Sequence, residues 1–316
     1  MIFSVVIPLF NKAWSIRLTL ESVLAQTFQD FEIIIVDDGS DDGGAIYASS
    51  INDHRLTVLR QANSGASAAR NAGIAAAHGE WIAFLDADDW WHPDYLKNQF
   101  ETLDNHPNVD MVTTSFRFMP QSVNWRPTPW QVSRSEARVE LITDLPRQWM
   151  RGSLFCTDSV AVRRTCLVTM QPCFAVGESF GEDLDLWFRL GEKTTIAHLH
   201  LALIVYRTFL TDSLSSKHSW QNLPPYLNRM QARALSGAMR PRQGASSLSF
   251  IAHCRLTHAR NASMIGDRKT ALCHIWHARS AINNRRWWVT LVMALMVPGR
   301  FVRRLQSWRD QRSETR

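Results

Sequence analysis

Cysteine is scarce in this 316-residue sequence, and the cysteines that are present form no recognisable pattern. The five residues include no Cys-x-x-Cys pair, and an odd number argues against a secreted disulfide framework. The start of the chain also lacks the basic stretch and the small-residue cleavage site of a secretory leader. We therefore expect reduced thiols and a cytoplasmic location.

Three motifs of common enzyme classes are missing as well. No Gly-x-Gly-x-x-Gly follows the first apolar run, where Pro8-Leu9-Phe10-Asn11 stands instead, and there is no Gly-Lys-Ser/Thr phosphate loop. These absences disfavour dinucleotide oxidoreductases and phosphate-loop ATPases. The chain also has no Gly-x-Ser-x-Gly nucleophile elbow. Cys273, His274 and His277 have helical spacing but too few partner ligands to indicate a zinc site.

The net charge of +6 comes from one end of the sequence. Residues 285–316 hold eight arginines and two acids, which equals the charge of the whole chain, and the remainder holds 27 bases and 27 acids. A basic surface over the whole protein, as nucleic-acid binding requires, is therefore not expected.

Short apolar runs alternate with helical patterns in the first part of the chain. This alternation is typical of a mostly parallel sheet covered on both faces, and predicts an α/β doubly wound fold. The expected strands are residues 3–9, 31–36, 56–60, 81–85 and 109–118, and the expected helices are 15–26, 42–51, 66–77 and 93–105.

A polar cluster follows each of the first four expected strands. In a doubly wound sheet, ligands bind outside the carboxyl ends of the strands, so clusters from four strands are expected to meet at one edge. Any one of them alone is also ordinary turn chemistry. The clusters are residues 10–12, 37–40, 63–65 and 86–89.

The pattern weakens after the first half and then becomes helical. Residues 120–150 lose periodicity and gather prolines and tryptophans, which favours a long, partly ordered active-site loop. Strands are expected at 159–164 and 196–207, with a helix at 182–191 between them. Helices at 248–264 and 269–282, separated by Gly266-Asp267, predict a helical hairpin.

Acidic residues in two places are candidates for chemistry. Asp86, Asp88 and Asp89 follow a buried strand, and crowded carboxylates that repel one another suit a magnesium or manganese ion shared with substrate phosphates. Glu182 and Asp183 begin an expected helix, where a carboxylate could take a proton from an acceptor hydroxyl. Acids in a first helical turn also simply favour the helix dipole, and the sequence does not separate these roles.

Two other segments suit a nucleotide. Asp37 and Asp38 end the second expected strand, where a carboxylate can accept from a base or a ribose hydroxyl. Residues 63–73 form a small-residue loop running into a helix, and Gly65 there lets the backbone approach a ligand closely. Arg70 lies within that helix, either as a ligand contact or as an ordinary exposed cation.

Taken together, these segments resemble the family 2 glycosyltransferases of the GT-A fold. The resemblance rests on the order and spacing of six segments and spans residues 1–215. The segments are Ser4-Val5-Val6-Ile7-Pro8-Leu9-Phe10-Asn11, Ser22-Val23-Leu24-Ala25-Gln26-Thr27-Phe28, and residues 31–40, 63–73, 86–90 and 181–190.

The resemblance implies a function and roles for individual residues. The enzyme would transfer a sugar from a uridine or deoxythymidine diphosphate donor, with inversion and with Mg²⁺ or Mn²⁺, to a hydroxyl of a glycan or lipid-linked acceptor. Pro8, Asn11, Asp38, Gly65 and Arg70 would line the nucleotide site. Asp88 would bind the metal, with Asp86 beside it and nearer the ribose. Asp183 would be the general base, with Glu182 as the alternative.

One departure from the family pattern keeps other functions open. Family members often carry a histidine after the Tyr-Arg of the last strand, but Thr208 and Phe209 follow Tyr206-Arg207 here, and phenylalanine cannot ligate a cation. Either His218 replaces that histidine, or the carboxylates and the diphosphate hold the metal alone, or the metal binds weakly. This departure keeps a non-catalytic nucleotide-sugar-binding relative as one alternative. A nucleotidyltransferase is the other, disfavoured because no basic triphosphate-cradling loop follows the first strand.

The expected organisation has three parts. Residues 1–215 form the catalytic domain, with a nucleotide-sugar half at 1–90 and an acceptor half at 91–215. Residues 216–284 form a helical extension, and residues 285–316 a basic amphipathic tail. The tail contains an apolar stretch, 287–297, flanked by arginines, which is too short to cross a bilayer but suits the interface of an anionic membrane. We expect a peripheral position on the cytoplasmic face, with no nucleic-acid partner.

Overall fold

The computed structural model describes residues 1–120, 130–132, 137–178, 180–208 and 223–296. The chain divides into two compact units. The first contains Met1–Leu145 and Gly152–Lys217, and the second contains Pro146–Arg151 and His218–Arg316.

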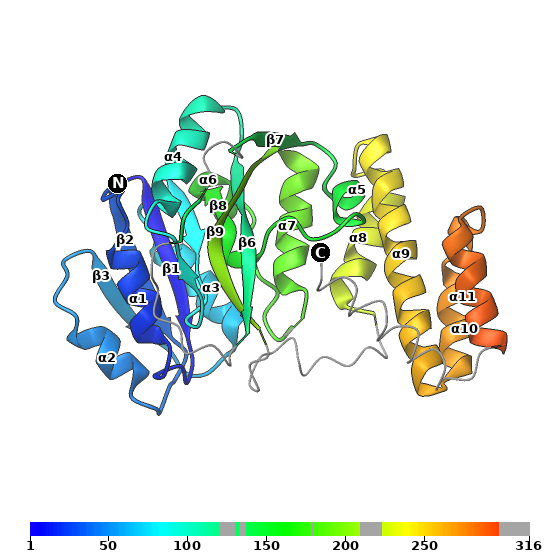
Figure 1. Ribbon diagram of the computed structural model, residues 1–316, viewed down its shortest axis with the longest axis horizontal. Helices are drawn as coiled ribbons and strands as arrows, with labels where there is room; N and C mark the ends of the chain where they lie inside the picture. Colours follow the sequence, from blue (N-terminus) through cyan, green and yellow to red (C-terminus); the bar gives the residue numbers. More distant parts are fainter. Residues whose placement is uncertain (121–129, 133–136, 179, 209–222, 297–316) are drawn as a thin grey trace. The chain divides into compact units, whose positions relative to one another are not determined.

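The first unit is built on one mixed sheet (Figure 1). Its strands run in the spatial order β3-β2-β1-β4-β8-β6-β9-β5, and β7 pairs with β9. β1, β2, β3 and β4 are parallel to one another, whereas β8 pairs antiparallel with β4 and β6. The bounds are β1 Phe3–Leu9, β2 Phe31–Asp37, β3 Leu56–Arg60, β4 Trp81–Phe84, β5 Trp90–Trp91, β6 Met111–Pro120, β7 Val139–Ile142, β8 Val160–Arg163 and β9 Ile196–Thr208.

Helices cover both faces of this sheet, as expected of a doubly wound fold. Those of the first unit are α1 Ile16–Leu24, α2 Gly44–Ser50, α3 Ala66–Ala76, α4 Tyr95–Asn105, α6 Arg164–Val168 and α7 Glu182–Lys193, and α5 Leu145–Trp149 follows β7. The mixed sheet and the helical second unit confirm the predicted fold class.

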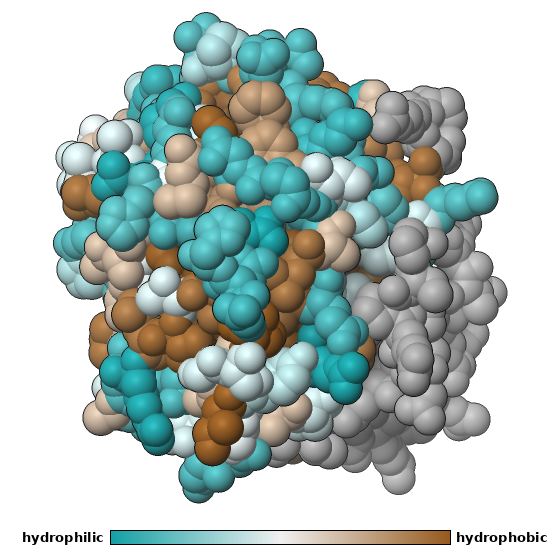
Figure 2. All heavy atoms as spheres, turned by 90° about the vertical axis from the view of Figure 1, so that its left-hand side faces the viewer, coloured by the Kyte–Doolittle hydropathy of each residue, from teal (hydrophilic) through white to brown (hydrophobic). Residues whose placement is uncertain are grey.

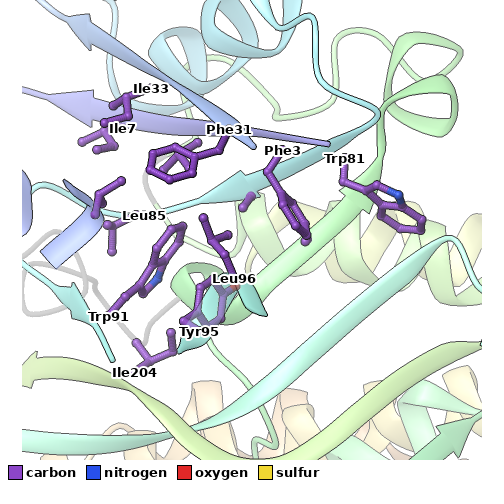
Figure 3. Packing of buried hydrophobic residues seen from close by; sticks show 14 of the residues in the cluster. Phe3, Ile7, Phe31, Ile33, Trp81, Leu85, Trp91, Tyr95, Leu96 and Ile204 are labelled. Carbon is purple, nitrogen blue, oxygen red and sulfur yellow. The ribbon is translucent and has the colours of Figure 1, made fainter. Parts of the chain in front are cut away.

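Alternate residues of β1 point to opposite faces of the sheet, because the side-chain period of a strand is two. Phe3 and Ile7 pack in a core cluster with Leu96 of α4 (Figure 3). On the other face, Val6 lies against Gly73 of α3, where an added Cβ would come within 2.4 Å of a Val6 methyl. Only glycine allows this close packing of α3 on the strand. The helix whose first turn follows Gly65 is thus held firmly at the sheet.

The surface of this unit is mixed in character. Figure 2 shows a band of hydrophobic side chains lying between hydrophilic ones on the face nearest the first strands. Phe10 and Trp14, which follow β1, are among the exposed large hydrophobic residues, at 45% and 49%.

The prediction of a loop over residues 120–150 is wrong in part. Residues 139–142 form β7, which pairs antiparallel with β9, and residues 145–149 form α5. This strand depends on the free edge that β9 offers, a long-range partner that local periodicity does not reveal. Two smaller differences concern helix ends. α4 begins at Tyr95, two residues after Pro93, and α10, which spans Arg268–His277, ends before the expected end at 282.

The second unit is helical in its described part. It contains α8 Pro225–Leu235, α9 Pro241–Ile265, α10 Arg268–His277 and α11 Arg285–Met296. Gly266 ends α9 with a positive φ of 87° and Asp267 caps α10, so the hairpin predicted at this dipeptide is present. Small side chains let α9, α10 and α11 pack closely around a core of Leu256, Ile275 and Trp287 with several alanines. No helix in the described ranges is long and apolar enough to cross a membrane.

Candidate functional site

The predicted site residues gather at the carboxyl ends of β1, β2 and β4. Pro8 lies in β1 next to Val36 of β2, so the chain beyond it emerges at this edge. Asn11 follows with a positive φ of 50°, and its Oδ1 accepts a hydrogen bond from the Asp41 backbone N–H at 3.0 Å. Its own backbone N–H donates to Ser40 Oγ at 3.1 Å. The loops after β1 and β2 are therefore fixed to each other.

Asp38 organises the loop that contains Gly65. Its Oδ1 accepts from the Ser64 backbone N–H at 2.9 Å and from the Gln61 side chain at 2.7 Å. Its Oδ2 accepts from the Gly65 backbone N–H at 2.8 Å. The carboxylate is buried, so it shapes the backbone at the start of α3. Gly65 itself has a φ of 89° and open space around it.

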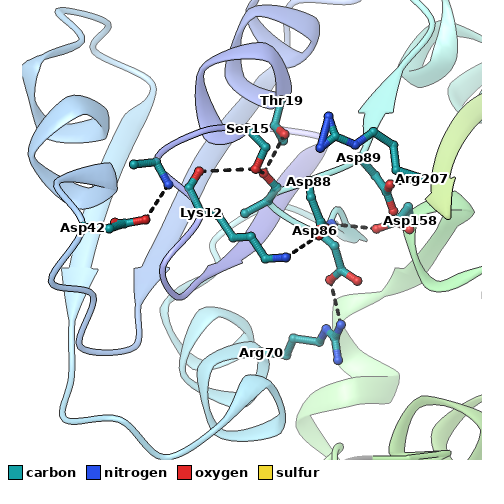
Figure 4. A network of polar contacts seen from close by, with 12 residues as sticks. Lys12, Ser15, Thr19, Asp42, Arg70, Asp86, Asp88, Asp89, Asp158 and Arg207 are labelled. Atoms are coloured by element: carbon teal, nitrogen blue, oxygen red, sulfur yellow. Dashed lines mark hydrogen bonds and ion pairs between the residues drawn. The ribbon is translucent and has the colours of Figure 1, made fainter. Parts of the chain in front are cut away.

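Arg70 joins the two predicted halves of the site, and its contact with Asp86 is drawn in Figure 4. Its Nη2 donates to Asp86 Oδ1 at 2.7 Å, and its Nη1 donates to Glu182 Oε1 at 3.2 Å. The guanidinium also lies over the ring of Phe174, 5.4 Å from its centre. Because Arg70 is only 5% exposed, it is a buried link between β4 and α7 and not an exposed cation.

A buried carboxylate cluster lies at the end of β4. Oxygens of Asp86, Asp89 and Asp158 all lie within 4.8 Å of one another, which is compatible with a divalent cation. Burial, with the Asp86 carboxylate next, raises the pKa of Asp158 to about 7. Burial, followed by Asp158 and Asp88, also raises the pKa of Asp89. Neighbouring acids in a dry site cannot all be charged unless a cation is present.

Asp158 was not predicted from the sequence. It lies in the short turn before β8, 72 residues from Asp86, and its Oδ1 accepts from the Asp86 backbone N–H at 2.6 Å. The only local signal is an acid directly before an apolar strand, which many turns share.

Asp88 points away from this cluster toward Lys12. The Lys12 ammonium donates to Asp88 Oδ2 at 2.6 Å (Figure 4), and both side chains are partly exposed, at 19% and 15%. Asp86 is 29% exposed at its side chain, whereas Asp158 is fully buried. Asp86 and Asp88 are thus the acids of this group that a ligand can reach, and Lys12 is the cation beside them.

Asp183 and Glu182 begin α7 but have different surroundings. Asp183 Oδ2 accepts from Thr157 Oγ1 at 2.7 Å, and its Oδ1 accepts from the Leu184 backbone N–H. Glu182 is 8% exposed and paired with Arg70. Burial, with the Asp183 carboxylate next, raises the pKa of Glu182 to about 7 although Arg70 opposes the rise. Asp183 is the more exposed of the two acids.

The end of β9 adds a cation beside the carboxylates. The backbone N–H of Arg207 donates to Asp89 Oδ1 at 2.7 Å. Its guanidinium stacks on the rings of Trp14 and Trp90, at 4.2 and 5.4 Å from their centres. Phe209 and His218, where the metal shell departs from the family pattern, lie outside the described residues.

Comparison with known proteins identifies the family and the fold of the chain. The family model for "Glycosyl transferase family 2" matches residues 4–165, about half of the chain. The putative glycosyltransferase EpsH of Bacillus subtilis (strain 168) is 45% identical over 115 residues, which cover 36% of this chain and 33% of EpsH. The uncharacterized glycosyltransferase YibD of Escherichia coli (strain K12) is 36% identical over 135 residues, covering 42% of this chain and 39% of YibD. The matched part thus spans a third or slightly more of these relatives.

The solved structures extend the likeness of the fold over nearly the whole chain. The S. aureus TarS 1-349 structure in complex with UDP-GlcNAc superposes with a TM-score of 0.70 and 20% identity, covering 98% of this chain and 92% of that one. The same TarS segment without that ligand gives a TM-score of 0.67.

Proposed function

The chain belongs to glycosyl transferase family 2, and from this premise we propose that it is a metal-dependent, inverting glycosyltransferase acting on a nucleoside diphosphate sugar. The observation that carries the proposal is the buried Arg70, which ties Asp86 at the donor edge to Glu182 beside Asp183. The buried Arg70 side chain thus connects the proposed donor site to the start of the helix that carries the candidate base. Catalysis by transfer needs this alignment of donor and acceptor.

A uridine or deoxythymidine diphosphate sugar is the proposed donor. The TarS structure of the same fold was solved with UDP-GlcNAc, and another with UDP. In the present chain, Pro8 lies near the end of β1 and Asn11 follows that strand, beside the Asp38 loop, and Gly65 leaves backbone space for a ligand there. We assign the nucleotide to these residues. The buried Arg70 supports the site through its hydrogen bond to Asp86.

Mg²⁺ or Mn²⁺ is the proposed cofactor. The acids at the end of β4 fit a hard cation, since they offer carboxylate oxygens, those of Asp86, Asp89 and Asp158 lie within 4.8 Å of one another, and burial and crowding raise the pKa of Asp158. Asp88 lies outside this set and would turn to the ion from Lys12. Asp88 and Asp86 would hold the ion because they are the accessible acids, while Asp89 and Asp158 support them from behind. When bound, the ion supplies positive charge that offsets the charge of the leaving diphosphate. Lys12, released from Asp88, would then donate to a phosphate oxygen.

Asp183 is the proposed general base. Its hydrogen bonds from Thr157 and the Leu184 backbone fix the carboxylate, and its exposure leaves it within reach of an acceptor hydroxyl. Taking that proton lets the hydroxyl oxygen attack the sugar from the face opposite the diphosphate, so the new bond forms with inverted configuration. Glu182 is held by Arg70 and serves as the alternative base.

The acceptor is proposed to be a glycan or lipid-linked hydroxyl at the cytoplasmic face of an anionic membrane. The basic sequence after residue 284 supports this assignment.

Product analysis tests the proposal. The purified chain, manganese and a panel of nucleotide sugars are incubated with acceptor extracts, and the released nucleotide is identified. Free nucleoside diphosphate together with a glycosylated acceptor supports transfer. Pyrophosphate release would indicate nucleotidyl chemistry, and binding without release would indicate a non-catalytic relative.

A further inference from the structure

The second unit is far more basic than the net charge of the protein suggests. Residues 218–316 carry 17 Lys and Arg against three acids, whereas residues 1–217 carry 18 against 26. The overall charge of +6 is therefore the sum of an acidic first part and a strongly basic second part. Charge separation of this kind favours an anionic partner for the basic part.

The described helices already carry this charge without the residues after 296. Eleven Lys and Arg lie between residues 223 and 296, and the only acid in that range is Asp267, which caps α10. None of the eleven is buried. Six are exposed: Arg240, Arg242, Arg268, Lys269, Arg279 and Arg285.

One face of α11 is fixed to the unit. Trp287, Thr290 and Ala294 are buried, and the Trp287 indole N–H donates to the Ile275 backbone oxygen of α10 at 3.1 Å. The Arg286 guanidinium donates to Thr257 Oγ1 of α9 at 2.8 Å. α11 is thus an integral helix of the second unit, whereas the sequence suggested a separate tail from residue 285 onward.

The opposite face of α11 is apolar and exposed. Its side chains recur at helical spacing, so they form one stripe along the helix, which we call the α11 stripe. Its members and their exposed fractions are Trp288 52%, Val289 41%, Val292 49%, Leu295 50% and Met296 75%.

We propose that the α11 stripe docks on the surface of a bilayer that contains anionic lipid. The 12 residues of α11 span roughly 18 Å, less than the ~30 Å of a hydrocarbon core, so the helix lies in the interface and does not cross it. Trp288 suits the headgroup level, and the exposed Arg285 one turn earlier meets lipid phosphate. Further arginines, Arg300, Arg303 and Arg304, follow α11 directly in the sequence.

Charge complementarity selects a membrane over a second copy of the chain. Two basic units brought together by their stripes would repel each other, whereas an anionic leaflet attracts the cations and takes up the apolar side chains. This inference concerns a binding partner and is read by vesicle binding alone. The inference rests on the membrane location in the proposed function, and its failure would remove that location but leave the proposed sugar transfer untouched.

Co-sedimentation of the full chain with phosphatidylcholine vesicles, with and without phosphatidylglycerol, tests the proposal. The triple variant Trp288→Ser, Val292→Ser, Leu295→Ser removes three stripe members that face solvent. Partitioning onto the anionic vesicles should fall by at least about tenfold, since burying one such side chain is worth roughly that factor. Leu235→Ser on α8, where Leu235 is 68% exposed, is the matched control and should bind as the unchanged chain does.

Three further measurements complete the test. Binding should weaken as salt is raised and should require phosphatidylglycerol. The single variant Leu295→Glu should also lose binding while keeping the thermal unfolding midpoint. Equal partitioning of the triple variant and the unchanged chain overturns the proposal. An absence of binding of the unchanged chain to anionic vesicles also overturns it. A third contrary outcome is a chain that binds no vesicles but sediments as a dimer, with the dimer abolished in the triple variant.

Discussion

The ammonium of Lys12 donates a 2.6 Å hydrogen bond to Oδ2 of Asp88, across the loops that follow β1 and β4. The pair brings one cation to the side of the acidic group where Asp86 and Asp88 are partly exposed, whereas Asp89 and Asp158 are buried. Asp88 is the proposed metal ligand and Lys12 the proposed phosphate partner. Binding of the metal-diphosphate group would exchange their mutual contact for contacts with the ligand, so each residue can be tested separately.

Removing the Asp88 carboxylate should abolish metal-dependent transfer. Asp88→Ala and Asp88→Asn are each expected to lower kcat by at least about a hundredfold, because a bound cation contributes several kcal/mol to stabilising the leaving diphosphate. Initial rates with Mn²⁺ and Mg²⁺, and after excess EDTA, provide the measurement. Full activity in EDTA would show that no metal is needed.

Replacing Lys12 should weaken binding of nucleoside diphosphate but not of nucleoside. A charged hydrogen bond contributes about 1.5–3 kcal/mol, so Lys12→Met should raise the Kd for UDP roughly ten- to a hundredfold. The Kd for uridine should stay unchanged in calorimetric titrations. The control is Lys97→Met, since Lys97 only pairs with Glu101 on the surface of α4. Equal loss of affinity for both ligands would assign Lys12 a structural role.

Asp183→Asn should separate chemistry from donor binding. The amide keeps an oxygen that can accept from Thr157 but cannot take the acceptor proton, so kcat should fall on the order of 10²–10⁴-fold. Donor Kd and thermal midpoint should be nearly unchanged. Thr157→Val removes only the hydrogen bond to Asp183 and should lower kcat less than Asp183→Asn does. If the donor Kd rises as much as kcat falls, the acid supports the start of α7 and is not the base.

The contribution of Asp158 to the stability of the metal-free protein should fall as pH rises from about 4 to about 7. The pKa of Asp158 is raised from 3.8 to about 7, so over this range the folded form keeps a proton that the unfolded chain has lost. Denaturant titrations in EDTA measure the slope, which Asp158→Asn should flatten. Asp53→Asn is the control, because Arg55 lowers the pKa of Asp53 to about 2 and its effect lies below this window. A slope that Asp158→Asn leaves unchanged would contradict the buried proton.

The sequence by itself determined the fold class and the position of the site. Apolar runs such as 3–9 and 31–36 are typical of buried parallel strands, and the polar residues after such strands meet at one edge of the sheet. Asp86 and Asp88 were found in this way, and Glu182 and Asp183 as acids that begin an expected helix. The family assignment and the mixed α/β sheet are confirmed. Their individual catalytic and metal-binding roles stay predictions.

Only the tertiary structure decided which of these groups are neighbours and which are buried. Asp158 joins Asp86 from 72 residues away, because β8 pairs antiparallel with β4, and such pairing depends on chain topology. Arg70 reaches both Asp86 and Glu182 because Gly73 lets α3 lie close on β1. Burial then sets the pKa of Glu182 and Asp158, since the cost of charge depends on surroundings that distant segments supply. Periodicity along the chain carries no information about those contacts.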